Sequence, residues 1–206
     1  MRALNQFPVS FMIPIRVLAF LVIVCQLCSH AVAQNIVELR GADTKYRFAD
    51  WNHTFKNSAV IDLFYVGVPG SNEFNLGGGY AFKLGKWTVN PLIYAVLGKE
   101  GSQRGMKLAL LLLFEKDGWK LNSFLGHYAR ISGDVQSYQL LDTLDFSKVV
   151  GKRWELGISN GFFHAGGMWN PQIGPLLKLN DRWGSWGASY RFGPQREFRA
   201  TRLFAF

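Results

Sequence analysis

Apolar and polar residues alternate with a period of two through most of this 206-residue chain, in segments separated by short turns rich in Gly, Asn, Asp and Lys. Between Trp183 and Phe192, for example, aromatic and small residues occupy every second position, and Ser185, Ser189 and Arg191 lie between them. No long stretch after Ala33 has the i, i+3, i+4 spacing of an amphipathic helix. The chain is therefore predicted to be all-β, and most strands have one apolar and one polar face.

The alternating segments are about 9 to 13 residues long, which is the length that a tilted strand needs to cross a bilayer. Strands of soluble proteins are usually about 5 or 6 residues long. Because an open strand edge in lipid leaves backbone N–H and C=O groups without partners, such strands must close into a barrel. We predict an antiparallel up-and-down transmembrane β-barrel over residues 58–206. Ten strands are favoured, and twelve are expected if residues 34–57 form another hairpin rather than an N-terminal leader.

Four tryptophans each follow a short turn, and they are Trp87, Trp119, Trp154 and Trp183. Tryptophan prefers the membrane–water interface, where its ring lies in lipid and its N–H group lies among the headgroups. Alternate turns of an up-and-down barrel lie at the same end, so the four residues predict an aromatic girdle at one membrane interface. A soluble β-sandwich with tryptophan in its core is the alternative.

The first 33 residues differ from the remainder of the chain. Arg2 and Arg16 are their only charges, residues 17–27 are apolar, and Ala31-Val32-Ala33 has the small-x-small pattern of a cleavage site. These features predict a secretory signal peptide over residues 1–33 that is removed after Ala33. The alternative is a membrane-anchoring helix, but the apolar run is shorter than the roughly 20 residues that a spanning helix needs.

Both cysteines, Cys25 and Cys28, lie in this first segment. Lipoprotein processing is a further alternative, although Val24 and Leu27 precede the two cysteines where a small residue would be required. The chain after Ala33 has no cysteine, so the exported protein must close its fold without disulfides. The net charge of +9 comes from scattered residues, which favours lipopolysaccharide phosphates or an anion-attracting lumen over nucleic acid as partners.

The end of the chain alternates as well, with Phe198, Phe204 and Phe206 on one face, which Arg202 interrupts. Together with the signal peptide and the alternating strands, this ending resembles the C-terminal signature of bacterial outer-membrane β-barrel proteins. The resemblance implies a location in the outer membrane, contact with its lipid and lipopolysaccharide, and insertion by the barrel-assembly machinery. It also implies that the turns beside the tryptophans are periplasmic. It does not imply one activity.

The polar faces of the strands are expected to line the lumen, with both charges present and a basic excess. The candidate lining residues are Asp62, Lys107, Arg130, Arg153, Glu155, Lys178, Arg191, Glu197 and Arg199. One interpretation is that these charges pair across the interior and close it. The other is a narrow aqueous path in which arginine and lysine favour anions.

No tight arrangement of nucleophile and base occurs around His53, His127 or His164, so no catalytic residue is predicted. No metal-ligand spacing, nucleotide motif or cofactor motif is present. The favoured function is porin-like passage of small polar or anionic solutes. The alternatives are a closed structural or interaction barrel, and a lipid-modifying enzyme with His164 near an external rim, close in sequence to Ser159 and Asn170.

Overall fold

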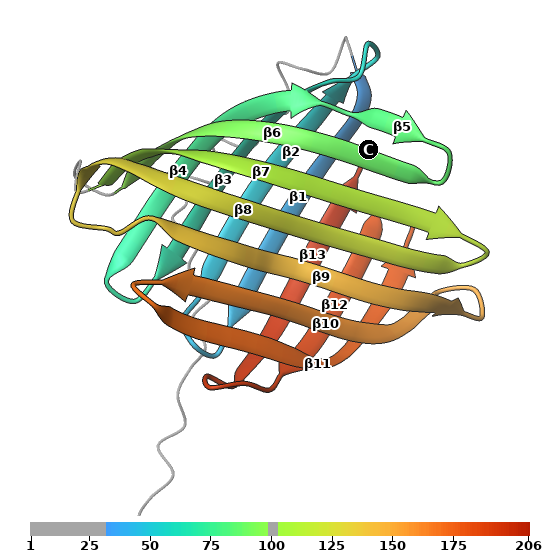
Figure 1. Cartoon of the computed structure of the whole chain (residues 1–206). Coiled ribbons are helices and arrows are strands. Elements are labelled where there is room, and N and C mark those ends of the chain that lie inside the picture. The colour runs from blue at the N-terminus through green and yellow to red at the C-terminus, as the bar shows by residue number, and fades with distance from the viewer. Residues whose placement is uncertain (1–31, 99–102) are drawn as a thin grey trace, which may run out of the picture.

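The computed structural model describes residues 32–98 and 103–206, and these residues form an antiparallel β-sheet that closes on itself (Figure 1). Most of the predicted signal peptide lies outside the described residues, and the predicted cleavage site falls at the start of the first strand. The strands are β1 (Val32–Ala42), β2 (Arg47–Phe55), β3 (Ala59–Val68), β4 (Ser71–Tyr80), β5 (Phe82–Leu84), β6 (Trp87–Gly98), β7 (Gln103–Lys116), β8 (Trp119–Gly133), β9 (Tyr138–Val150), β10 (Trp154–Ala165), β11 (Met168–Asp181), β12 (Gly184–Arg191) and β13 (Glu197–Ala205).

The barrel has twelve strand positions, because β4 and β5 occupy one position together. Both pair with β6, with β4 along one part of that strand and β5 along the other. The barrel closes where β1 pairs with β13, from Ile36 opposite Ala205 to Ala42 opposite Arg199. The prediction of a closed, antiparallel, all-β barrel is confirmed.

The strand count is twelve, which was the alternative, and not the favoured ten. The difference is the β1–β2 hairpin, whose registered pairs include Glu38 with Asp50 and Leu39 with Ala49. This hairpin lies between β3 and β13 and satisfies the edges of both strands, which would otherwise lack hydrogen-bond partners in lipid. No helix in the described part of the chain is long and apolar enough to cross a bilayer.

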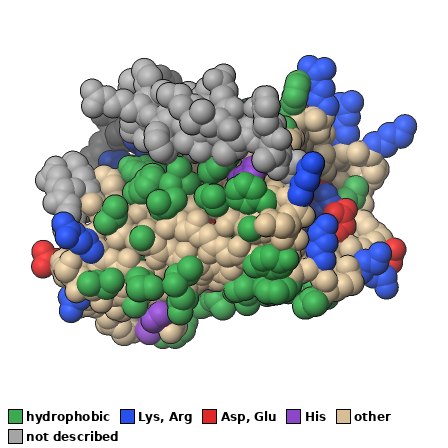
Figure 2. All heavy atoms as spheres, turned by 90° about the horizontal axis from the view of Figure 1, so that it is seen from above, with side chains coloured by type: hydrophobic (Ala, Val, Ile, Leu, Met, Phe, Trp, Pro, Cys, Tyr) green, Lys and Arg blue, Asp and Glu red, His purple; other side chains and the backbone are tan. Residues whose placement is uncertain are grey.

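Side chains alternate between the outside and the inside of the barrel. On β6, Ile93 and Leu97 point outward and are about half exposed, whereas Tyr94 and Val96 point inward and are 1% exposed. In Figure 2, hydrophobic side chains spread over the middle of the face that is seen, and Lys and Arg side chains gather toward its ends. An apolar outer belt between polar ends is typical of a barrel that crosses a membrane.

The two ends of the barrel differ in their aromatic residues. One end, which we call the tryptophan end, contains the turns at 56–58, 85–86, 117–118, 151–153 and 182–183. Trp87, Trp119, Trp154 and Trp183 all lie at this end, each next to a turn and each exposed. The turns at 43–46, 69–70, 134–137, 166–167 and 192–196 form the other end, the loop end.

The run Gly77-Gly78-Gly79 lies inside β4. A Cβ atom on Gly77 would collide with the ring of Tyr94 and the carbonyl oxygen of Ile93, and one on Gly79 would collide with the carbonyl oxygen of Pro91. Glycine is therefore required where β4 and β6 approach each other closely, and its role here is in packing.

Candidate functional site in the barrel lumen

The lumen contains a cavity of about 890 Å³. Its lining includes Lys56 and Ser58 next to the tryptophan end, and Val68 and Gln195 next to the loop end. The cavity lining thus reaches both ends of the barrel, and inward side chains of the surrounding strands decide what can enter it.

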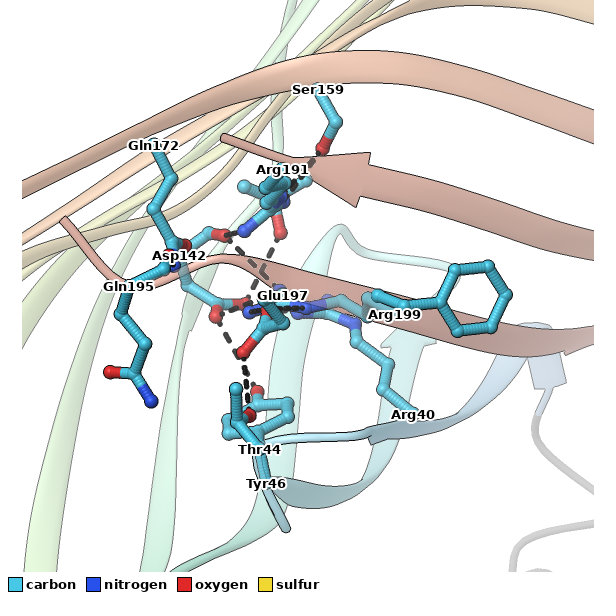
Figure 3. Close-up of polar contacts among 12 residues, drawn as sticks. Arg40, Thr44, Tyr46, Asp142, Ser159, Gln172, Arg191, Gln195, Glu197 and Arg199 are labelled. Atoms are coloured by element: carbon cyan, nitrogen blue, oxygen red, sulfur yellow. Dashed lines mark hydrogen bonds and ion pairs between the residues drawn. The ribbon is translucent and has the colours of Figure 1, made fainter. Parts of the chain in front are cut away.

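A group of charged side chains crosses the lumen near the loop end (Figure 3). The carboxylate of Asp142 on β9 accepts hydrogen bonds from Arg40 on β1 and from Arg199 on β13, the latter at 3.3 Å. Arg40 also donates to Glu38, at 2.7 and 2.8 Å, and Arg199 donates to Glu197 at 2.9 Å. Because β9 is not a neighbour of β1 or β13 in the sheet, Asp142 ties opposite walls together.

Arg191 lies beside this group and is held differently. Its Nε and Nη2 atoms donate to the hydroxyl oxygen of Ser159 at 3.0 and 2.7 Å, and its Nη1 atom donates to the backbone carbonyl oxygen of Asp142 at 3.1 Å. Within the described residues, no carboxylate lies within ion-pair distance of Arg191. We call Arg40, Asp142, Arg191, Glu197 and Arg199 the arginine cluster.

A second ion pair lies on the facing wall, also toward the loop end. Lys107 on β7 and Glu73 on β4 are 2.5 Å apart, and Glu73 accepts a hydrogen bond from Tyr138 at 2.7 Å. The ammonium group of Lys107 also lies 4.9 Å from the ring centre of Phe64, within the range of a cation–π contact. This cation is therefore enclosed by a carboxylate and aromatic rings.

Two further ion pairs lie nearer the tryptophan end, on strands β8 to β11. Lys178 pairs with Asp145 at 3.0 Å, and Lys120 pairs with Glu155 at 2.7 Å. Glu155 also accepts hydrogen bonds from Ser147 at 3.1 Å and from Asn180 at 2.8 Å. These pairs explain how the barrel interior holds several charges, since a buried charge needs a partner and hydrogen bonds.

One part of the lumen wall is apolar, next to polar lining residues such as Asn52 and Asp62. Phe48, Phe64 and Phe124 all line the cavity, with ring centres 5.6 Å apart for Phe48 and Phe64 and 6.0 Å apart for Phe64 and Phe124. Leu111 and Leu140 line the same cavity and pack against the same cluster of buried residues. We call these five residues the aromatic wall. Its existence was not predicted.

Seven of the nine predicted lining residues point into the barrel, and they are Asp62, Lys107, Glu155, Lys178, Arg191, Glu197 and Arg199. Arg130 and Arg153 do not. Arg130 pairs with Gly105 near the end of β8 and is exposed at the loop end, where its Nη1 atom donates to the carbonyl oxygen of Gly133. Arg153 lies in the exposed turn at 151–153, since β10 begins one residue later, at Trp154.

Several inward charges were missed, and they are Glu38, Arg40, Asp50, Glu73, Lys120, Asp142 and Asp145. Glu38, Arg40 and Asp50 belong to the β1–β2 hairpin, which the sequence alone does not assign to the barrel, and Asp142 lies where the register of β9 shifts against both neighbours. Among the described buried and half-buried lumen charges, carboxylates outnumber cations, and the exposed lining residues Lys56 and Lys83 make the two numbers equal, so the predicted basic excess is not found. The sequence does contain a signal for these charges: the apolar residues Val37 and Leu39 alternate with the charged residues Glu38 and Arg40, which is typical of a barrel strand.

His164 does not form a catalytic group with Ser159. His164 lies on the outer face of β10, where its ring stacks on Trp169 with ring centres 4.1 Å apart. Ser159 points the other way, into the lumen, where it is hydrogen-bonded to Asp145 and Arg191. No group of three or more His, Cys, Asp or Glu side chains in the described ranges is arranged to hold a metal ion.

The C-terminal phenylalanines Phe198 and Phe206 are exposed, and Phe204 lies on the same outer face of β13 as Phe198. Arg202 interrupts this face but is accommodated there. Its guanidinium group lies 2.9 Å from Asp181 and 4.7 Å from the ring centre of Trp186, which points outward from β12.

No protein-family model matches this chain, and no curated protein matches its sequence. Among solved structures, the chain is similar to the KdgM porin, with a TM-score of 0.63, 13% identity, and coverage of 84% of this chain and 99% of that one. It is also similar to the KdgM porin in complex with disordered oligogalacturonate (TM-score 0.63, 12% identity, 84% and 99% covered) and to the NanC porin (TM-score 0.57, 8% identity, 82% and 98% covered). At such low identities the likeness is one of fold, and the chain has the β-barrel fold of these porins.

Proposed function

We propose that this chain is a porin-like barrel of the bacterial outer membrane that passes small polar solutes, anions among them. The observation that carries the proposal is the lumen cavity of about 890 Å³, whose lining reaches both ends of a barrel with an apolar outer belt. The similarity in fold to the KdgM porin, which has been solved with oligogalacturonate, supports it.

The width of the barrel and its inner side chains restrict the solutes to small ones. Barrels of eight strands are just filled by side chains, whereas those of 16 to 18 strands leave a wide aqueous channel. A twelve-stranded barrel lies between these sizes, and the arginine cluster further occupies part of the lumen. A narrow path of this kind selects solutes by the groups that line it.

Arg191 is the residue that favours anions within this path. Three of its N–H groups are used by Ser159 and by the carbonyl of Asp142. Arginine has five N–H donors, so two have no acceptor among the described residues, and Arg191 lines the cavity with only 2% of its surface exposed. No carboxylate of residues 32–98 or 103–206 is in direct contact with its charge, unlike the charges of Arg40 and Arg199.

The orientation and the export of the barrel are part of the same proposal. Residues 1–33 act as a cleaved signal peptide, and residues 34–206 form the exported barrel. The tryptophan end faces the periplasm, the assembly machinery reads Phe198, Phe204 and Phe206, and lipopolysaccharide surrounds the loop end. We assign no enzymatic activity, because His164 and Ser159 face opposite sides of β10.

The test is the single-channel conductance of the protein purified from outer membranes, in a planar bilayer with a salt gradient. Discrete conductance steps are expected, and Arg191→Gln should move the reversal potential toward cation selectivity. Arg196→Gln, at the exposed loop end, is the matched control and should leave the reversal potential unchanged. A folded barrel with neither conductance nor solute flux into liposomes would contradict the proposal and favour a closed structural barrel.

A further inference from the structure

The lumen has two chemically different walls that meet in one cavity. The arginine cluster is presented by β1, β9, β12 and β13, and the aromatic wall is presented mainly by β2, β3, β7 and β8. The two are continuous, because the guanidinium carbon of Arg40 lies 4.3 Å from the ring centre of Phe48. Phe48 in turn contacts Phe64, and Phe64 contacts Phe124.

The aromatic wall has surface that the protein itself does not cover. Leu111, Phe124 and Leu140 are only partly buried, although they point into the barrel and not toward the lipid. Leaving apolar surface in contact with water is unfavourable by roughly 25 cal/mol per Å². A fully hydroxylated solute would not reduce this unfavourable free energy, whereas a solute with an aromatic ring or an alkyl chain would cover the apolar surface and reduce it.

The cavity also has the character of a small-molecule binding pocket. Such pockets have volumes of about 300 to 1,000 Å³ and are lined mainly by hydrophobic and aromatic side chains, with a few polar groups that orient the ligand. The lumen cavity has about 890 Å³, the aromatic wall on one side and the donors of Arg191 on the other. Polar residues such as Asn52 and Gln172 line other parts of the cavity, but the aromatic wall together with Arg191 matches an amphipathic ligand better than a purely polar one.

We propose that the lumen binds a small amphipathic carboxylate, with its ring or short alkyl chain on the aromatic wall and its carboxylate at Arg191. This inference rests on the proposed function and names the class of solute. The carboxylate fits because, in the part of the chain that the structure describes, two N–H donors of Arg191 have no acceptor and no carboxylate lies within ion-pair distance of its guanidinium group. A charged head joined to an apolar body is the one arrangement that satisfies both walls at once.

The first experiment compares two probes of equal charge, 4-phenylbutyrate and glucuronate. Their binding to the full exported protein in phosphatidylcholine nanodiscs is measured by titration calorimetry, with empty nanodiscs subtracted for partitioning. Burial of a phenyl group on the aromatic wall should make the affinity for 4-phenylbutyrate at least about tenfold higher. Equal affinities, or tighter binding of glucuronate, would overturn the proposal.

A pair of variants locates the site. Leu140→Asn should weaken the binding of 4-phenylbutyrate about fivefold and leave glucuronate unchanged, and Leu140→Met should retain wild-type affinity for both. Folding of each variant is checked by its heat-dependent mobility on gels. If Leu140→Asn does not fold, Leu111→Asn is used in its place.

Arg191→Gln should weaken the binding of both probes, because both carry a carboxylate. An unchanged affinity of 4-phenylbutyrate in the Asn variant or in Arg191→Gln would refute this placement.

Conductance separates this inference from the proposed function. If the barrel binds 4-phenylbutyrate preferentially but never conducts, the result supports the binding site and refutes the porin function. If the barrel conducts but binds both probes equally, the result supports the porin function and refutes the amphipathic site. In a conducting barrel, 4-phenylbutyrate should block current at lower concentration than glucuronate does, and the reverse order would count against the site.

Discussion

Asp142 on β9 accepts a hydrogen bond from Arg40 on β1 across the lumen, although 102 residues separate the two along the chain (Figure 3). The same carboxylate also contacts Arg199, so it lies between two guanidinium groups from adjacent strands. This contact joins opposite walls of the barrel, and its removal should affect both stability and ion selectivity.

Asp142→Asn should lower the free energy of unfolding by about 2 kcal/mol, because two buried guanidinium groups lose the charge between them while each keeps a glutamate partner. It should also shift the reversal potential toward anions, since the lumen loses a negative charge. Urea unfolding in detergent micelles and bilayer recordings measure the two effects. Asp134→Asn, in the exposed loop at 134–137, is the control and should change stability by less than about 0.5 kcal/mol.

Lys107→Met should destabilise the barrel by about 3 kcal/mol, because Glu73 is left as an enclosed carboxylate without its cation. Adding Glu73→Gln should restore most of that loss, since the double variant leaves no unpaired charge. The measurement is a double-mutant cycle by urea unfolding. A double variant that is as unstable as the sum of the two single variants would show that the ion pair is not the cause.

Gly77→Ala should destabilise the barrel by about 1 to 3 kcal/mol, because the new methyl group meets the ring of Tyr94 and the carbonyl of Ile93. Gly187→Ala is the matched control, since a Cβ there is 3.5 Å from the nearest atom, on Thr201, and makes an ordinary contact. Its stability should stay within about 0.5 kcal/mol of the wild type. Equal effects of the two substitutions would contradict the close approach of β4 and β6.

Trp154→Ala should weaken the folded barrel in bilayers by about 1 kcal/mol, because an exposed aromatic ring is lost from the membrane interface at the tryptophan end. In detergent micelles, which lack an ordered headgroup layer, the loss should be smaller. Trp154→Phe keeps an apolar ring there and should recover part of the difference. The comparison of unfolding in vesicles and in micelles checks this prediction, and an equal loss in both would argue against an interfacial role.

Processing after Ala33 should leave Gln34 as the first residue of the protein in the outer membrane. Intact-mass spectrometry of the purified protein measures this directly. Ala33→Arg should block cleavage and leave the precursor mass, because the peptidase site requires small residues. A wild-type protein that retains residues 1–33, or that carries lipid on Cys25 or Cys28, would refute the signal-peptide prediction.

Much of the fold follows from the sequence by itself, because period-two alternation is a local property of each strand. The polar faces that carry Asp62, Arg191 and Arg199 were assigned inward from alternation, and these residues line the cavity. The position of Trp154 at the end of the barrel was likewise predictable from the turn before it. Closure of the sheet followed from the cost of an open edge in lipid.

Only the tertiary structure decided the count of twelve strands and the composition of the lumen. The place of the hairpin containing Arg40 depends on the pairing of β1 with β13, which joins the first and last described strands. A register shift in β9 lies at Asp142, and Arg130 is exposed because it lies near the end of β8, which alternation alone does not reveal. Contacts across a lumen, such as those of Asp142 or the rings of Phe64 and Phe124, depend on which strands face one another after closure. That arrangement is non-local, and no segment of the sequence contains it.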